Sequence, residues 1–424
     1  MYGGKLFTQA GMTLVLIIVN LAVIFVLAFL VWRKDKQKIF WWALGVKLAC
    51  GIMVGLLYQH YYSTGDTWTF FSEGKGVVEA FKEQPKAAID FFWWDKLPHG
   101  VHDVDSRPRS LFFLKWVSLF NFFNGNNYWI TSLYFTLISF FGSWYLVKIL
   151  NKHFPDLKTE SILAILFIPS IVLWGSGVIK ESIAIGFLFY LSGILLDWYF
   201  IRKISILKCL LAILSCWVLW NLKYYWLAAW LAVVVPLIGV NLLQPGWHWI
   251  KLNPKMSWLA FLMISIAGIS LFHPNFYYYR FFSVIVDNYN AYLALSQPDG
   301  VIHFYKLDST WWSIIINSPW ALISGLFRPF IFEANNILQA AAAMENLGLL
   351  ILVAFSVYRF RDYVSQISLL QVAVVFYIIF LCVFLTLSTP NFGTLSRFKI
   401  GFTPFLWLGL LVASNVLSRF RKSS

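Results

Sequence analysis

The chain has 424 residues and a formal net charge of +14; 60% of its residues are hydrophobic and only 12% are charged. Soluble domains carry about 25% charged residues, so this chain has too few polar side chains to cover a water-soluble globule. Its basic residues are scattered among apolar runs, which argues against a nucleic-acid-binding groove. The composition predicts an integral membrane protein with many spans.

Apolar runs of about 20 residues predict helices that cross a bilayer. We therefore predict an all-α, polytopic membrane protein, a single transmembrane domain over residues 1–424 with about eleven spans. Two long apolar runs need to be divided, because each contains a polar or glycine-rich break. The predicted spans are residues 11–32, 40–60, 128–148, 161–175, 181–200, 206–221, 225–243, 257–273, 337–358, 367–388 and 401–418, with the breaks at 174–177 and 221–225.

Alternate loops between these spans differ in charge. The positively charged set consists of residues 33–38, 148–160, 202–208, 251–255, 359–362 and 419–422. The positive-inside rule places this set in the cytoplasm. We therefore expect a multi-pass protein of the bacterial inner (cytoplasmic) membrane, with its N-terminus outside and its C-terminus inside. The first apolar run lacks a small-residue cleavage site, so we expect it to be retained.

Two long hydrophilic segments fall on the outer side, residues 61–127 and 274–336. In the first, residues 67–92 alternate apolar and charged side chains at helical spacing, which predicts helices lying on the membrane interface. In the second, prolines interrupt the apolar run 311–331, and a full crossing would place the basic residues 359–361 outside. We therefore expect a re-entrant or interfacial segment there. The cytoplasmic loops are too short for a nucleotide-binding domain, so any chemistry should occur at the outer face.

Asp66 directly follows the second predicted span, among Gly and aromatic residues. A carboxylate at this position can act as a general base or hold a cation, and the alternative is a helix N-cap. The run from His99 to Asp105 contains two His and two Asp, but its spacing matches no familiar metal motif, so we predict no metal site there. No cofactor is required by the sequence, and a divalent cation is the one candidate.

Two arginines, Arg107 and Arg109, follow in the same segment. Guanidinium groups bind phosphate oxygens bidentately, and the alternative is ordinary contact with lipid headgroups. Lys180 and Glu181 open the fifth predicted span behind two glycines, where a helix N-terminus favours an anion. Simple anchoring is the alternative for this pair. Lys223 stands beside two tyrosines and reads as a snorkelling lysine in an aromatic belt.

Arg328 and Glu333 lie in the apolar part of the second outer segment. Charged groups at depth cost about 2.5–3.5 kcal/mol each on insertion scales, so a mutual ion pair is the alternative to substrate binding. A short polar turn between the last two spans contains Asn391, Arg397 and Lys399. Positive residues are disfavoured in short outer loops, so these two cations point to a phosphate or pyrophosphate ligand.

These features together resemble the GT-C class of membrane glycosyltransferases and the related polymerases of exopolysaccharide and O-antigen synthesis. The likeness lies in an interfacial loop that begins at Asp66, in short outer loops with Lys, Arg and Glu, and in the turns at 169–181 and 391–397. In that class the first outer loop supplies an acidic residue near the acceptor or the donor phosphate, which implies this role for Asp66. The chain departs from the class by an additional N-terminal helix and by the absence of a second acidic residue beside Asp66.

The resemblance implies a glycosyltransferase or glycan polymerase that uses a polyprenyl-(pyro)phosphate-linked sugar at the outer leaflet, in cell-surface polysaccharide or glycoconjugate synthesis. Asp66 would be the base. The substrate-binding candidates are Arg107, Arg109, Lys180, Glu181, Arg328, Glu333, Asn391, Arg397 and Lys399. Membrane lipids are the other expected partners, and nucleic acid is not. Two alternatives stay open: a transporter or flippase of lipid-linked glycans, and a non-catalytic membrane subunit of an envelope complex.

Overall fold

The computed structural model describes residues 2–62, 66–101, 107–271, 274–277, 280–359 and 367–414. Helices account for 83% of the structure, and the described residues form no β-strand. The predicted all-α class is therefore confirmed. The chain folds into two compact units. Unit 1 comprises Met1–Lys148, Val172–Ile194 and Ser205–Tyr224, and unit 2 comprises Ile149–Ile171, Leu195–Ile204 and Tyr225–Ser424.

Among the described residues, seven helices are long and apolar enough to cross a membrane, and the number is eight if one bent helix pair counts as a span. The seven are α1 (Tyr2–Trp32), α2 (Ile39–His60), α6 (Tyr128–His153), α9 (Lys180–Ile201), α10 (Ile206–Leu243), α15 (Ile337–Tyr358) and α17 (Leu369–Ser388). The bent pair runs from α18 (Phe392–Phe398) into α19 (Thr403–Ser414), with a bend of 71°. These helices are those of a membrane protein.

Three of the predicted spans are not single helices of spanning length. The predicted span 401–418 corresponds to α19, which has 12 residues and counts as a span only together with α18. Residues 161–175 form two short helices, α7 (Lys158–Leu166) and α8 (Pro169–Trp174). The break precedes Pro169, because proline disfavours a helical conformation at the residue before it. The predicted span 257–273 corresponds to α12 (Pro254–Ile269), which has 16 residues.

Both predicted helix breaks are present. Gly177, in the turn between α8 and α9, has φ +80°, a conformation that glycine adopts without steric cost. Lys223 has φ −143° and ψ 61°, which interrupts the helical backbone inside α10. The long apolar runs are therefore divided where glycine and polar residues interrupt them.

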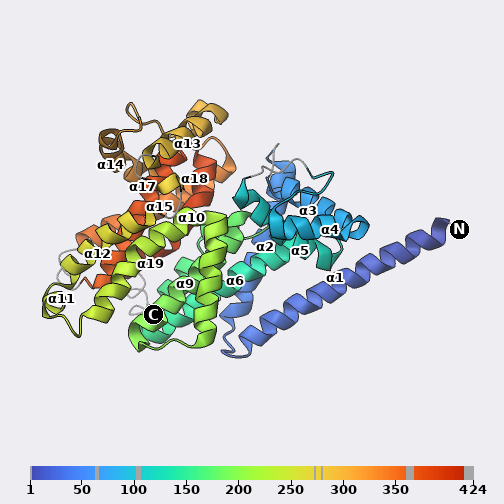
Figure 1. Cartoon of the computed structure of the whole chain (residues 1–424), viewed down its shortest axis with the longest axis horizontal. Coiled ribbons are helices and arrows are strands. Elements are labelled where there is room, and N and C mark those ends of the chain that lie inside the picture. The colour runs from blue at the N-terminus through green and yellow to red at the C-terminus, as the bar shows by residue number, and fades with distance from the viewer. Residues whose placement is uncertain are drawn as a thin grey trace. The chain divides into compact units, whose positions relative to one another are not determined.

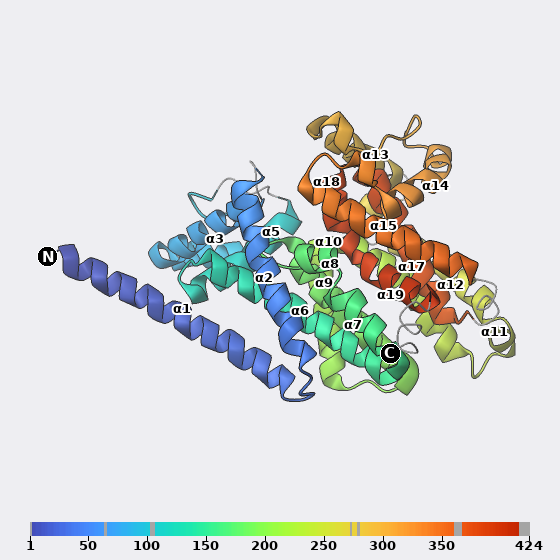
Figure 2. The same ribbon diagram turned by 180° about the vertical axis from the view of Figure 1, so that it is seen from behind.

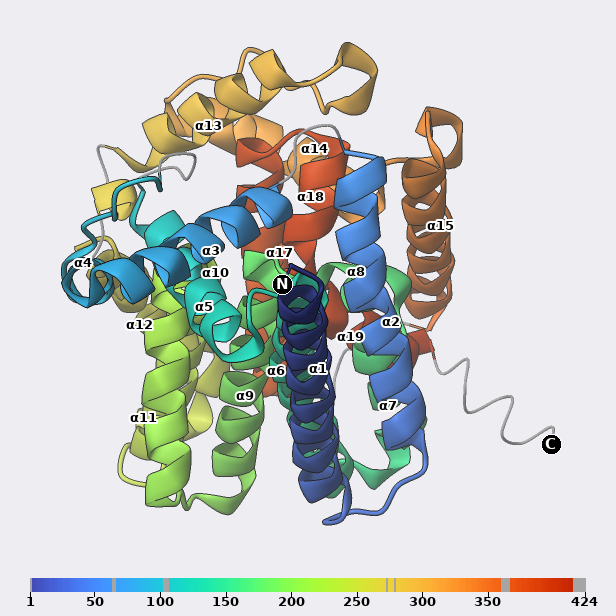
Figure 3. The ribbon, with the colours of Figure 1, turned by 90° about the vertical axis from the view of Figure 1, so that its right-hand side faces the viewer.

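Unit 1 contains α1, α2, α3 (Asp66–Glu83), α4 (Pro85–Trp94), α5 (Pro108–Asn124) and most of α6 and α9 (Figure 1). The ring of Phe40 on α2 lies 5.0 Å from that of Phe140 on α6, and a methyl group at Gly142 of α6 would overlap the backbone of α9. The helix α3 runs across the direction of α2 (Figure 3) and packs on α5, with the Phe70 and Phe113 rings 4.9 Å apart. The helices predicted within 67–92 are therefore present as α3 and α4.

Unit 2 contains α7, the second part of α10, α11 (His248–Leu252), α12, α13 (Phe281–Leu295), α14 (Trp311–Phe327), α15 and the helices from α17 to α19. The short α11 and the longer α13 lie at opposite ends of this unit (Figure 2). The helix α14 packs closely on α17, since a methyl group at Gly325 would overlap Thr386. With 17 residues and an internal proline, Pro319, α14 is not among the candidate spans. The re-entrant or interfacial position of this segment stays a prediction.

Candidate functional site

The ten predicted site residues divide between the two units. Unit 1 holds Asp66, Arg107, Arg109, Lys180 and Glu181, and unit 2 holds Arg328, Glu333, Asn391, Arg397 and Lys399.

In unit 1, the turn at Gly177 leads into α9, whose first two residues are Lys180 and Glu181. The Lys180 Nζ donates a hydrogen bond to Ser110 Oγ at 3.0 Å and lies 4.8 Å from the centre of the Phe70 ring. The Lys223 Nζ lies 2.6 Å from Glu181 Oε1, and the two side chains are only 5% and 2% exposed. The break in α10 therefore places a lysine against the first turn of α9.

The contact between Arg109 and Tyr224 closes this arrangement. The guanidinium carbon of Arg109 lies 5.5 Å from the centre of the Tyr224 ring. Because Arg109 precedes Ser110 and Tyr224 follows Lys223, the contacts form a closed circuit. We call this circuit the cation ring; its members are Arg109, Ser110, Lys180, Glu181, Lys223 and Tyr224.

The cation ring combines two physical features that favour an anion. It links three cationic side chains, those of Arg109, Lys180 and Lys223, with one carboxylate, that of Glu181, which the Lys223 ammonium contacts. It also includes the first turns of two helices, α5 and α9. The N-terminus of a helix carries partial positive charge from its aligned peptide dipoles, although in the first turn of α5 the Ser110 and Leu111 N–H groups already bond to the Arg107 carbonyl. Phosphate oxygens suit such a set of donors.

Three of the six members of the cation ring were among the site residues predicted from the sequence. They are Arg109, Lys180 and Glu181, and the structure brings these three together. Sequence reasoning missed Lys223, which it assigned to an aromatic belt, although the polar break at 221–225 within a long apolar run was a visible signal. Arg107 is exposed, at the N-terminal end of α5.

Asp66 is the first residue of α3, and its side chain lies outside the described part of the structure. Phe70, which Lys180 contacts, lies one helical turn after Asp66. The backbone of α3 therefore leads from the predicted base to the cation ring.

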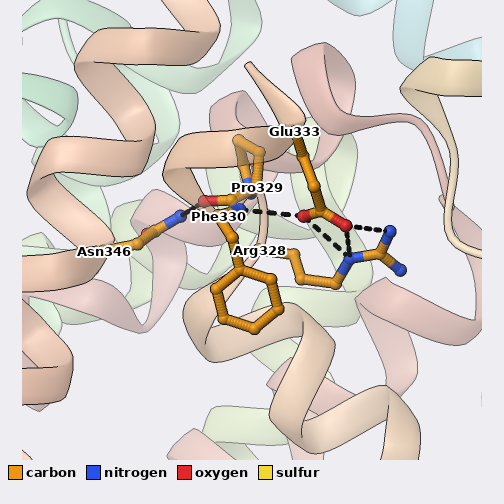
Figure 4. A network of polar contacts seen from close by, with 5 residues as sticks. All are labelled: Arg328, Pro329, Phe330, Glu333 and Asn346. Atoms are coloured by element: carbon orange, nitrogen blue, oxygen red, sulfur yellow. Dashed lines mark hydrogen bonds and ion pairs between the residues drawn. The ribbon is translucent and has the colours of Figure 1, made fainter.

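In unit 2, Arg328 and Glu333 pair with each other (Figure 4). The Arg328 Nε donates to both carboxylate oxygens at 2.9 and 3.1 Å, and Nη2 donates to Oε1 at 2.5 Å. The Phe330 N–H adds a bond of 2.8 Å. Partial burial raises the pKa of Glu333, but the hydrogen bonds from Arg328 and Phe330 and the charge of Arg328 outweigh it and lower the pKa. Arg328 and Glu333 therefore form the ion pair that was the alternative to substrate binding.

The other unit 2 candidates also have contacts that hold backbone segments together. The Lys399 Nζ donates to Asn346 Oδ1 at 3.0 Å, and Asn346 Nδ2 donates to the Pro329 carbonyl at 3.1 Å (Figure 4). Asn391 accepts the Thr394 N–H at 3.0 Å and so caps α18. The guanidinium carbon of Arg397 lies 5.3 Å from the Phe398 ring centre. Substrate binding by these residues stays a prediction.

Glu345, a carboxylate within α15, contacts the start of α8. Its two oxygens accept the Ser170 N–H at 2.9 Å and the Ser170 hydroxyl at 2.5 Å. A carboxylate at a helix N-terminus is stabilised by the unpaired N–H groups there. This contact accounts for an anion inside an apolar helix.

Among the described residues, no group of three or more His, Cys, Asp or Glu side chains is placed to hold a metal ion. The run from His99 to Asp105 lies largely outside those residues, since 102–106 are not described. Comparisons of the chain with protein-family models, with curated proteins and with solved structures found no match.

Proposed function

We propose that the protein is a membrane glycosyltransferase or glycan polymerase that takes its sugar from a polyprenyl-phosphate carrier at the outer leaflet. The cation ring is the observation that carries this proposal. Glycosyl transfer from such a carrier breaks the bond between the sugar and a phosphate, so the leaving group needs fixed positive charge. The cation ring supplies three cationic side chains, one of which is paired with Glu181, and a low local dielectric strengthens the effect of a charge.

The residues divide the chemistry between them. Arg109, Lys180 and Lys223 hold the lipid phosphate, with the arginine able to bind two of its oxygens at once. Glu181 keeps Lys223 in place through their 2.6 Å contact. Asp66 accepts the proton of the attacking acceptor hydroxyl, as a general base. A divalent cation beside Asp66 would supply further positive charge to the phosphate.

In unit 2, the contacts favour a structural role for Arg328 and Glu333, which satisfy each other. Asn391 stabilises the start of α18. Arg397 and Lys399 remain the secondary candidates for contact with a phosphate or pyrophosphate.

The proposal includes a position in the bacterial inner membrane, with the N-terminus outside and eleven crossings, some made of short or broken helices. Contacts within unit 1 support the assignment of alternate loops to a common side of the membrane. The cation ring joins three segments that are all predicted to be outside. At the opposite side, the Lys148 Nζ lies 2.7 Å from Asp35 Oδ1, and both residues belong to predicted cytoplasmic loops. Contacts thus join segments predicted to lie on the same side.

The test uses purified protein in lipid nanodiscs with a polyprenyl-phosphate-linked or pyrophosphate-linked sugar as donor. We expect sugar transfer by the wild type, and a loss of at least a hundredfold for Asp66→Asn and Lys180→Met. Lys75→Met is the matched control, because Lys75 is an exposed cation on α3. Transfer by both site variants at the wild-type rate would contradict the site assignment.

A flippase of lipid-linked glycans is the second candidate function. The observation that favours it is the pair of interrupted helices, α10 at Lys223 and the bent pair α18–α19. Discontinuous helices commonly form the substrate sites of transporters. The two functions differ in product: an enzyme changes the length of the glycan, whereas a flippase changes only its leaflet.

A further inference from the structure

Glu73 is a buried carboxylate with an unsatisfied oxygen. It lies in α3 and is 8% exposed. Its Oε2 is closed off from solvent and has no hydrogen-bond partner within the part of the chain that the structure describes. Burying a carboxylate is unfavourable unless donors surround it. Two other buried carboxylates have such donors: Glu181 contacts Lys223, and Asp197 contacts Lys152.

The position of Glu73 on α3 connects it with the proposed site. Asp66, Phe70 and Glu73 follow each other at spacings of four and three residues, which places them on one face of the helix. The Phe70 ring contacts the Lys180 ammonium, 4.8 Å from its centre. Glu73 therefore lies three residues, about 4.5 Å of helix rise, beyond the Phe70 contact with the cation ring.

The packing of α3 fixes this position. The neighbouring Gly74 faces α5 so closely that a methyl group there would come within 2.8 Å of Val117. The Phe70 ring packs on Phe113 of the same helix. The backbone that carries Glu73 is thus held by α5, the helix whose first turn carries Arg109 and Ser110. Rotation about the last bond of a Glu side chain is soft, so the carboxylate can turn toward a ligand without moving α3.

We propose that Glu73 is the sugar-binding carboxylate of this site, and that it accepts a hydrogen bond from a hydroxyl group of the lipid-linked sugar. This inference rests on the proposed function. The cation ring would hold the phosphate, and Glu73 would contact the sugar that is attached to it. A sugar hydroxyl is a neutral donor, and a hydrogen bond to a charged acceptor is stronger than one between neutral groups.

A structural role for Glu73 makes the opposite prediction about stability. If a carboxylate stabilises the fold, its replacement by an apolar side chain lowers the melting temperature. A carboxylate that lacks a partner until substrate binds destabilises the free protein, so its removal leaves stability unchanged or raises it. The melting temperature and the affinity therefore move in different directions under the two accounts.

The test compares Glu73→Met and the isosteric Glu73→Gln with the wild type. Glu79→Gln is the matched control, because Glu79 lies on the same helix and is 55% exposed. Two probes are titrated into the purified protein: a polyprenyl pyrophosphate that carries a sugar, and the same lipid without it. We expect Glu73→Met to bind the sugar-bearing lipid at least tenfold more weakly, to bind the bare lipid unchanged, and to melt at the wild-type temperature or above. Glu73→Gln should show the same pattern.

Two results would overturn the inference. One is equal affinity of wild type and Glu73→Met for the sugar-bearing lipid; the other is a lower melting temperature for both Glu73 variants with parallel losses for both probes. Failure of the proposed function has a different signature, because the wild type would then bind neither lipid, or would bind both without transferring the sugar.

Discussion

Removal of one partner of the Glu181–Lys223 pair should destabilise the protein strongly, whereas removal of both should not. At 2.6 Å and an effective dielectric constant of about 20, the Coulomb attraction is about 6 kcal/mol. Most of this is offset by the cost of taking both charges out of water. Since the side chains are 2% and 5% exposed, a remaining single charge would lose this counter-ion at a position with little access to solvent.

We therefore expect Glu181→Gln and Lys223→Met each to lower the free energy of unfolding by about 3–5 kcal/mol. That loss corresponds to a change of about a hundredfold or more in the folding equilibrium constant. The double variant should lose less than either single variant, because no unpaired charge is left. Replacing a whole buried ion pair by neutral groups is often close to neutral for stability.

The assay is unfolding in mixed micelles with increasing SDS, followed by the fluorescence of the tryptophans. The control pair is Lys75 and Glu79 on α3, which lie 3.6 Å apart and are 51% and 55% exposed. Neutralising an exposed pair of this kind should cost at most about 1 kcal/mol. Additive losses at Glu181 and Lys223, or losses no larger than those of the control pair, would refute the reasoning.

Two further predictions concern packing and pH. Gly142→Ala should destabilise the protein by about 1–3 kcal/mol through overpacking, because the added methyl group would overlap the carbonyl of Gly186; Gly409→Ala, which has nothing within 4 Å, is the control, and a loss as large in the control would contradict the packing argument. The pKa of Glu333 is lowered from its ordinary value of 4.5 by Arg328 and the local backbone, so its ion pair contributes stability above that pH, and the contribution disappears as the pH falls through the lowered pKa. The stability difference between wild type and Glu333→Gln should accordingly be present at neutral pH and vanish in acid; a difference that is constant with pH would contradict the assignment.

The fold class and the two helix breaks could be predicted from the sequence because they are local properties. Composition dictates burial in lipid, and the glycine at 177 and the polar residues around 223 interrupt apolar runs. The division of 161–175 into two helices also had a local signal, Pro169, which the hydropathy argument outweighed. Arg328 and Glu333 are five residues apart, so their pairing was among the alternatives that the sequence suggested.

The complete cation ring could not be predicted from the sequence, because its contacts join segments that are distant along the chain. Glu181 and Lys223 are 42 residues apart, and Lys180 and Ser110 are 70 apart. A lysine beside tyrosines is as typical of an aromatic belt as of an ion pair, and only the packing of α9 against the break in α10 decides between them. The sequence does not distinguish Glu73 from the other charged residues of an amphipathic helix. Its burial depends on the packing of α3 against α5.

The central claim is that the protein consumes a polyprenyl-linked sugar at the outer leaflet. The most direct measurement is the analysis by mass spectrometry of lipid-linked saccharides in cells that lack the protein, compared with cells complemented by the wild type or by Lys180→Met. We predict that a polyprenyl-(pyro)phosphate-linked saccharide accumulates in cells that lack the protein, and that only the wild type clears it. An unchanged pool of lipid-linked saccharides, or clearance by Lys180→Met as complete as by the wild type, would contradict this account.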